Sequence, residues 1–153
     1  MIINQKSLWE IHPLSPMERY KKTFIDPKGR KTSYGLTEVG YDIRLAQDVW
    51  LFPGRRFVLA STMERFKLPK HVRGRVENKS TLARMGLDAS RTTNLEPGWE
   101  GWLTLELEYA KWKPLKLYKG MGIATVVFEE LKHPAQYIGK YQNQARGPVK
   151  AVL

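Results

Sequence analysis

Residues 102–108 read Trp-Leu-Thr-Leu-Glu-Leu-Glu, and this alternation of apolar and polar side chains decides the fold class. Successive side chains of a β-strand point to opposite faces of the sheet. The stretch therefore predicts a strand with one buried face and one polar face. The buried face would carry Leu103, Leu105 and Leu107, and the polar face Trp102, Thr104, Glu106 and Glu108.

Similar strand-like segments occur between glycines and prolines in the rest of the chain, at residues 41–52, 56–68, 72–77 and 123–128. Short strands separated by turn signals are typical of antiparallel sandwiches and barrels. Glu96-Pro97-Gly98 predicts a type II turn, with proline second and glycine third. We therefore expect a mainly all-β fold.

The chain has 153 residues, a length that suits one domain spanning residues 1–153. We expect residues 1–40 to be irregular apart from short pieces, because Pro13, Pro16 and Pro27 interrupt any long helix. Residues 133–153 form a basic tail punctuated by glycine.

Residues 80–85, followed by Gly86, have the one helical signature, and Ser80 or Thr81 could cap its first turn. Ser80 and Arg84 would then share a face, beside backbone amides suited to an anion such as phosphate. An ordinary capped turn with an exposed arginine is the alternative interpretation of the same residues.

Glu106 and Glu108 lie on the polar face of the predicted strand. A carboxylate held in a partly dry site can act as a general base. A solvated glutamate on the outside of a sheet is the alternative. The alternation does not decide between the two glutamates.

Residues 137–144 combine aromatic, cationic and amide side chains near the C-terminus. Such a segment could close over a nucleotide as a lid, with tyrosine stacking and lysine pairing with phosphate. A disordered basic tail is equally compatible with this composition. We assign no ligand or catalytic role to the three histidines, which are scattered along the chain.

Composition limits the chemistry that the chain can perform. It contains no cysteine, so thiolate nucleophiles, disulfides and cysteine-based zinc sites are excluded. Its 26 Lys and Arg residues against 15 Asp and Glu give a formal charge of +11, which predicts an anionic partner such as nucleic acid, nucleotide phosphate or an acidic lipid surface. Because no signal peptide or long apolar stretch is evident, we expect a cytoplasmic protein.

Together these segments resemble the dCTP deaminase branch of the trimeric dUTPase-like family. The resemblance covers residues 40–144, and its signature is Lys79-Ser80-Thr81-Leu82-Ala83-Arg84-Met85-Gly86-Leu87. The other matching segments are residues 40–45, residues 57–60 with Glu64 and Leu68-Pro69, residues 95–101, Thr104-Leu105-Glu106 and residues 140–144.

The resemblance implies a dUTPase-like β-barrel or distorted jelly roll with one short helix, assembled as a homotrimer with active sites between subunits. It implies that Glu106 is the catalytic acid and base, that Ser80 and Arg84 complete the catalytic centre, and that Mg²⁺ arrives with the triphosphate. The substrate-binding residues that it implies are Lys79, Ser80, Thr81, Leu82, Ala83, Arg84, Asn94, Glu96, Thr104, Leu105, Glu106, Tyr137, Lys140 and Gln144.

Three positions depart from the family pattern. Glu96 replaces the usual Asp, the loop at residues 88–94 is one residue shorter, and Thr125 stands where dUTP-hydrolysing relatives have Gln. The first and third departures favour deamination without pyrophosphate release. The shorter loop runs close to the base pocket and leaves the base specificity open.

The leading hypothesis is zinc-independent, hydrolytic deamination of a deoxycytidine nucleotide, from dCTP and water to dUTP and ammonia. Without cysteine the chain cannot build the ligand set of the zinc deaminases, so Glu106 would have to activate water directly. The alternatives are a dUTPase or bifunctional enzyme of the same fold, and a non-catalytic basic β domain that binds nucleic acid or protein.

Overall fold

Antiparallel strands are the main regular structure of the protein, as a computed structural model describes it for residues 1–92 and 94–153. The largest sheet has the strand order β1-β12-β5-β4-β3, and β8 pairs with the opposite edge of β12. Its strands are β1 (Ile2–Ile3), β3 (Lys22–Ile25), β4 (Lys31–Leu36), β5 (Tyr41–Arg44), β8 (Val72–Asn78) and β12 (Gly122–Glu130).

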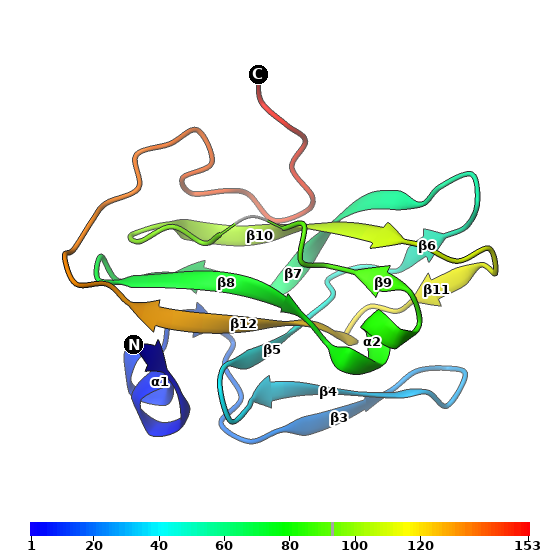
Figure 1. Cartoon of the computed structure of the whole chain (residues 1–153), viewed down its shortest axis with the longest axis horizontal. Coiled ribbons are helices and arrows are strands. Elements are labelled where there is room, and N and C mark those ends of the chain that lie inside the picture. Colours follow the sequence, from blue (N-terminus) through cyan, green and yellow to red (C-terminus); the bar gives the residue numbers. More distant parts are fainter. Residues whose placement is uncertain (93) are drawn as a thin grey trace.

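A second sheet, of order β2-β7-β10-β9, covers the first, and a two-stranded ribbon of β6 and β11 lies at one end of the molecule (Figure 1). The two layers and the ribbon are consistent with the expected β-barrel or jelly roll. These strands are β2 (Leu14–Ser15), β6 (Val49–Leu51), β7 (Phe57–Lys67), β9 (Leu87–Asp88), β10 (Glu100–Tyr109) and β11 (Leu115–Leu117).

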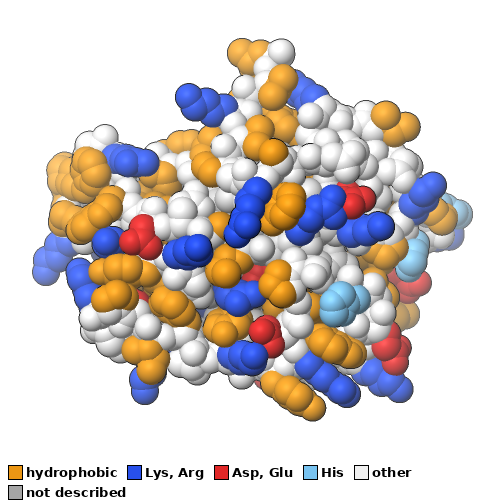
Figure 2. All heavy atoms as spheres, turned by 180° about the vertical axis from the view of Figure 1, so that it is seen from behind, with side chains coloured by type: hydrophobic (Ala, Val, Ile, Leu, Met, Phe, Trp, Pro, Cys, Tyr) orange, Lys and Arg blue, Asp and Glu red, His pale blue; other side chains and the backbone are white. Residues whose placement is uncertain are grey.

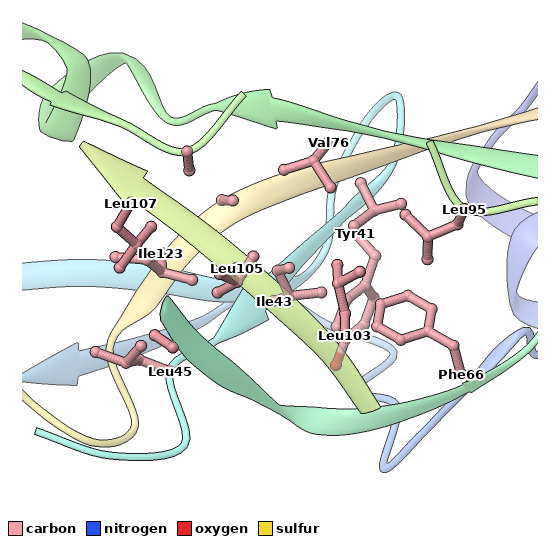
Figure 3. Packing of buried hydrophobic residues seen from close by; sticks show 14 of the residues in the cluster. Tyr41, Ile43, Leu45, Phe66, Val76, Leu95, Leu103, Leu105, Leu107 and Ile123 are labelled. Atoms are coloured by element: carbon pink, nitrogen blue, oxygen red, sulfur yellow. The ribbon is translucent and has the colours of Figure 1, made fainter. Parts of the chain in front are cut away.

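The alternation predicted for residues 102–108 is confirmed in β10. Leu103, Leu105 and Leu107 are buried, whereas Trp102, Thr104, Glu106 and Glu108 are partly exposed. Figure 3 shows the three leucines meeting side chains from the first sheet, including Tyr41, Ile43 and Ile123. The core therefore lies between the two sheets, and the polar face of β10 points away from it.

The single strand predicted at residues 41–52 is wrong, because the chain forms β5 and β6 in different sheets. Between them, the backbone N–H of Leu45 donates to Met121 O at 2.9 Å and that of Ala46 to Ser61 O at 2.8 Å. The chain thus leaves the first sheet at Leu45 and reaches the ribbon, where β6 pairs with β11.

The expectation of one short helix is also wrong, since two helices are described, α1 (Gln5–Ile11) and α2 (Ser80–Arg84). Helix α1 ends at His12, which adopts a left-handed conformation and donates its N–H to Leu8 O. With α1, β1, β2 and the β3–β4 hairpin, residues 1–40 contain more regular structure than their prolines suggest.

No helix in residues 1–92 and 94–153 is long and apolar enough to cross a membrane.

Basic side chains are spread widely over the surface. Figure 2 shows Lys and Arg distributed from edge to edge of one face, with hydrophobic side chains between them and few acidic ones. On this face the charge of +11 is therefore not concentrated in a single patch.

Candidate active site

Glu106 lies beside a cavity of about 670 Å³ on the polar side of β10. The strand alternation directs its side chain away from the core, and its backbone N–H donates to Thr92 Oγ1 at 3.0 Å. No ion pair joins its carboxylate to another residue in the described part of the chain. We call this cavity the Glu106 pocket; the predicted residues Asn94, Glu96, Thr104, Tyr137 and Gln144 also line it.

Glu108, two residues along the same face, has different surroundings. Its carboxylate forms an ion pair with the guanidinium of Arg91, which also lies 4.0 Å from Asp88. Hydrogen bonds from the side chains of Ser90 and Asn78 hold the pKa of Asp88 below its ordinary value, so that carboxylate stays charged beside Arg91. Glu108 is thus neutralised, whereas Glu106 is left facing a cavity. The strand pattern does not distinguish the two glutamates, because the partner of Glu108, Arg91, lies on a different segment of the chain.

One wall of the Glu106 pocket begins at the predicted turn. Trp99 N donates to Glu96 O at 3.1 Å and Gly98 has φ 72°, as a type II turn requires of its third residue. Pro97 O accepts the backbone N–H of Tyr137 at 2.8 Å. The turn therefore holds the start of the tail beside the pocket.

The tail is docked on β10 and on the turn. Trp99 Nε1 donates to Tyr141 O at 2.7 Å, and Gln144 Nε2 donates to Thr104 Oγ1 at 2.7 Å. Val149 N donates to the same hydroxyl at 3.0 Å, and Val149 lines the pocket. Lys140 does not line it, and its ammonium donates to Val152 O. All four of these tail contacts are thus made within the chain.

The signature forms α2, as predicted, but the predicted cap is wrong. Lys79 is the N-cap residue, and no side-chain hydrogen bond caps the helix. Ser80 is the first helical residue and shares α2 with Arg84, and both side chains are exposed. This leaves Ser80 and Arg84 on the surface, free to meet another molecule.

The ammonium of Lys79 is part of a buried polar network. It forms an ion pair with Asp42 Oδ2, and the two side chains are 12% and 3% exposed. Asp42 also accepts hydrogen bonds from Thr125 Oγ1 at 2.6 Å and from Ser33 Oγ at 3.1 Å. The positive charge of Lys79 is therefore already neutralised by Asp42. The signature alone does not predict this pairing, because Asp42 lies on a strand that is remote in sequence.

A second cavity, of about 620 Å³, is lined by the first four residues of the signature, Lys79 to Leu82, and we call it the signature pocket. No described residue lines both this cavity and the Glu106 pocket. One chain therefore does not bring Ser80 and Arg84 together with Glu106 around a single cavity. Of the other predicted residues, Lys79, Thr81 and Leu82 line the signature pocket, Ala83 and Arg84 line neither, and Leu105 lies in the core.

The short loop between β9 and β10 borders the Glu106 pocket through Asn94. Thr92 is buried and fixes the loop to β10 through its contact with Glu106 N. Thr93 lies outside the described residues.

In residues 1–92 and 94–153 there is no group of three or more His, Asp or Glu side chains that could hold a metal ion.

Sequence comparison gives the family of the chain. Residues 17–131 match a family model described as dCTP deaminase-like. The dCTP deaminase of Herpetosiphon aurantiacus is 37% identical over 79% of this chain and 84% of its own length. The dUMP-forming dCTP deaminase of Corynebacterium diphtheriae is 39% identical over 84% of this chain and 70% of its own length.

Solved structures share the fold at low sequence identity. The 2'-deoxycytidine 5'-triphosphate deaminase of Agrobacterium tumefaciens matches with a TM-score of 0.56 and 15% identity, over 84% of this chain and 47% of that one. A mutant dUTPase from the Staphylococcus aureus phage phi11, described with a structural Mg(II) ion, matches with a TM-score of 0.57 and 15% identity, over 79% and 97% of the two chains. The family model and the sequence relatives together establish that the chain belongs to the dCTP deaminase-like family.

Proposed function

We propose that the protein hydrolytically deaminates a deoxycytidine nucleotide, converting dCTP and water to dUTP and ammonia. The observation that carries this proposal is the carboxylate of Glu106, which lines a cavity without a cationic partner among the described residues while Glu108 is held by Arg91. Membership of the dCTP deaminase-like family supports the same reaction.

In the proposed mechanism, Glu106 takes a proton from water as the water oxygen attacks C4 of the cytosine ring. Glu106 gives this proton to N3, then takes the proton of the new C4 hydroxyl and passes it to the amine, so that the C4–N bond breaks and ammonia leaves as the C4 carbonyl forms. The half-buried position of Glu106 suits both steps, because the carboxylate reaches the cavity from a rigid strand whose backbone is paired with β7. The chain thereby performs with a carboxylate alone what a zinc-bound water does in other deaminases.

We further propose that each active site is shared between two copies of the chain in a homotrimer. Ser80 and Arg84 are exposed on α2, and they belong to a different part of the molecule from the Glu106 pocket. A second copy that presents its α2 to the Glu106 pocket would complete the centre. Closed cyclic symmetry would repeat this contact at each interface.

The residues around the Glu106 pocket would bind the nucleoside part of the substrate, with the tail closing over it. Tyr137 and Gln144 already line that pocket, and Lys140 would exchange the Val152 carbonyl for a phosphate oxygen when nucleotide binds. Mg²⁺ would be held by triphosphate oxygens, since the described residues contain no acidic cluster suited to an ion of its own. When bound, the ion would neutralise phosphate charge.

The second candidate reaction converts dCTP to dUMP, ammonia and pyrophosphate, because several relatives are named dUMP-forming. Two features favour dUTP as the product. Glu96 is longer than the Asp of dUTP-hydrolysing relatives, and the hydroxyl of Thr125 is engaged by Asp42 at 2.6 Å. A non-catalytic role in binding nucleic acid is less well supported, since the basic side chains are dispersed on the face that Figure 2 shows.

The test is incubation with dCTP, dCMP and dUTP in the presence of Mg²⁺, with products separated by chromatography and ammonia measured. The proposal predicts ammonia and dUTP from dCTP. Stoichiometric pyrophosphate and dUMP from dCTP would instead support the bifunctional reaction. No turnover of any deoxynucleotide, together with salt-sensitive binding to duplex DNA, would favour the non-catalytic alternative.

A further inference from the structure

The signature pocket has a second wall that the family signature does not supply. This wall is the β3–β4 hairpin, whose residues Lys21, Thr23, Lys31 and Ser33 line the cavity opposite Lys79 and Ser80. The hairpin lies against the part of the molecule that carries α2, as Figure 1 shows. The hairpin precedes residues 40–144, on which the resemblance depends. The resemblance therefore implies no site residue in it.

The strand register explains why three of these residues share a face. Thr23 is paired with Ser33 and Ile25 with Lys31 across the hairpin. Because side chains alternate along each strand, Thr23, Lys31 and Ser33 lie on one face, and Lys21, which directly precedes β3, lines the same cavity. The hairpin therefore presents two ammonium groups and two hydroxyls to the cavity.

The charge balance of the cavity favours an anion. Lys79 is neutralised by Asp42, the one carboxylate among the described residues that line this cavity. Lys21 and Lys31 form no ion pair with any residue in the described ranges, whereas their neighbour Lys22 is paired with Glu18 at 2.7 Å. Two positive charges thus remain uncompensated beside the hydroxyls of Ser80 and Thr81.

We infer that Lys21 and Lys31 bind the β- and γ-phosphates of the nucleotide whose substrate site includes Ser80, and that the hairpin makes the enzyme select triphosphates over monophosphates. This inference rests on the proposed function. Lysine ammonium groups on flexible stems suit mobile phosphate oxygens, and charge-assisted hydrogen bonds to phosphate are among the stronger polar contacts. The hairpin lysines would supply the positive charge that Lys79 cannot offer while it is paired with Asp42.

The test compares a Lys21→Gln/Lys31→Gln double variant with a Lys22→Gln/Lys28→Gln double variant. Both remove two positive charges from the same hairpin, but Lys22 and Lys28 do not line the cavity. Thermal unfolding verifies that each variant is folded. Steady-state kinetics with dCTP, and calorimetric titration of the Glu106→Gln background with dCTP and dCMP, give KM, kcat and Kd.

We expect the Lys21/Lys31 variant to raise KM and Kd for dCTP by about tenfold or more with kcat nearly unchanged, as loss of uniform binding does. Its Kd for dCMP should stay near that of the parent, and the control variant should resemble the parent throughout. An unchanged KM in an active enzyme, or equal losses for dCTP and dCMP, would overturn the inference and leave the deaminase proposal intact. A parent protein that neither binds nor deaminates any deoxycytidine nucleotide would overturn both.

Discussion

Glu106 and Glu108 have the same side chain on the same face of β10, yet their surroundings differ. Arg91 forms an ion pair with Glu108 and also lies near Asp88, so it completes a local charge network. Glu106 instead faces the pocket with its carboxylate free of any ion pair in the described part of the chain. Alternation along the strand predicts that both glutamates lie outside the core. The position of Arg91 then distinguishes them, because it pairs with Glu108 and not with Glu106.

Glu106→Gln should abolish most deamination without unfolding the protein. The amide keeps the shape of the side chain but cannot accept the proton from water, and loss of such a group typically lowers rates by about 10²- to 10⁴-fold. Glu108→Gln is the matched control and should change the rate little, because it removes only a partly exposed ion pair. Ammonia release and thermal unfolding measure the two effects, and a Glu106→Gln enzyme as fast as wild type would contradict the assignment.

Breaking the buried pair of Arg44 and Glu64 should strongly destabilise the fold, because it leaves one charge buried without its partner. Arg44 Nε donates to Glu64 Oε1 at 2.8 Å, and the Glu64 side chain is 0% exposed. Glu64→Gln would leave the Arg44 guanidinium without its counter-charge, so we expect the free energy of unfolding to fall by about 3 kcal/mol or more. Urea denaturation provides the measurement.

The control for this prediction is Glu77→Gln, which breaks a solvent-exposed pair with Arg75. An exposed pair of this kind should change stability by about 1 kcal/mol or less. Equal losses for Glu64→Gln and Glu77→Gln would contradict the role given to the buried pair.

At the scale of elements, the β3–β4 hairpin depends on the turn at Asp26. Asp26 Oδ1 accepts the backbone N–H groups of Lys28 and Arg30, each at 2.9 Å. Burial acts to raise the pKa of this carboxyl, but the hydrogen bonds from Arg30 and Lys28 outweigh it and hold the pKa below its ordinary value. The turn is therefore stabilised by the ionised form of Asp26.

This shift gives the hairpin a pH dependence of definite sign. Because the pKa is lowered in the folded hairpin, the stabilisation is complete above the unfolded value of about 3.9 and is lost as the pH falls through the lower folded value. NMR of the Lys28 and Arg30 amides should thus show the turn loosening below about pH 4, and Asp26→Asn should lack this transition. Amide signals that do not change down to pH 2.5 would contradict it.

Elements with a strong local pattern could be predicted from the sequence, and those fixed by distant contacts could not. The alternation in β10 and the turn at Gly98 were predicted because each depends on neighbouring residues alone. Helix α1 was missed because the left-handed residue that follows it is His12, whereas a glycine, Gly86, marks the end of α2 in the sequence. The division of residues 41–52 depends on hydrogen bonds to Met121 and Ser61, which are remote in sequence.

At the scale of the whole molecule, the fold places the signature and the Glu106 side chain of β10 at different cavities. The sequence predicted Ser80, Arg84 and Glu106 as one constellation, but a single chain distributes them between α2 and the Glu106 pocket. This separation depends on how the two sheets pack against each other. The packing cannot be predicted from the pattern of residues along any one segment. It follows that an isolated chain should lack a complete centre, and that activity should require association of copies.

The most direct measurement mixes two inactive variants. Glu106→Gln lacks the proton acceptor and Arg84→Ala lacks a residue of α2, so oligomers of either variant alone should release almost no ammonia from dCTP. When equal amounts are co-expressed or refolded together, random assembly leaves both residues intact at about a quarter of the shared sites, and that share of wild-type activity should return. A mixed oligomer, verified by differential tagging, that stays as inactive as its parents would contradict a site built from two copies around Glu106.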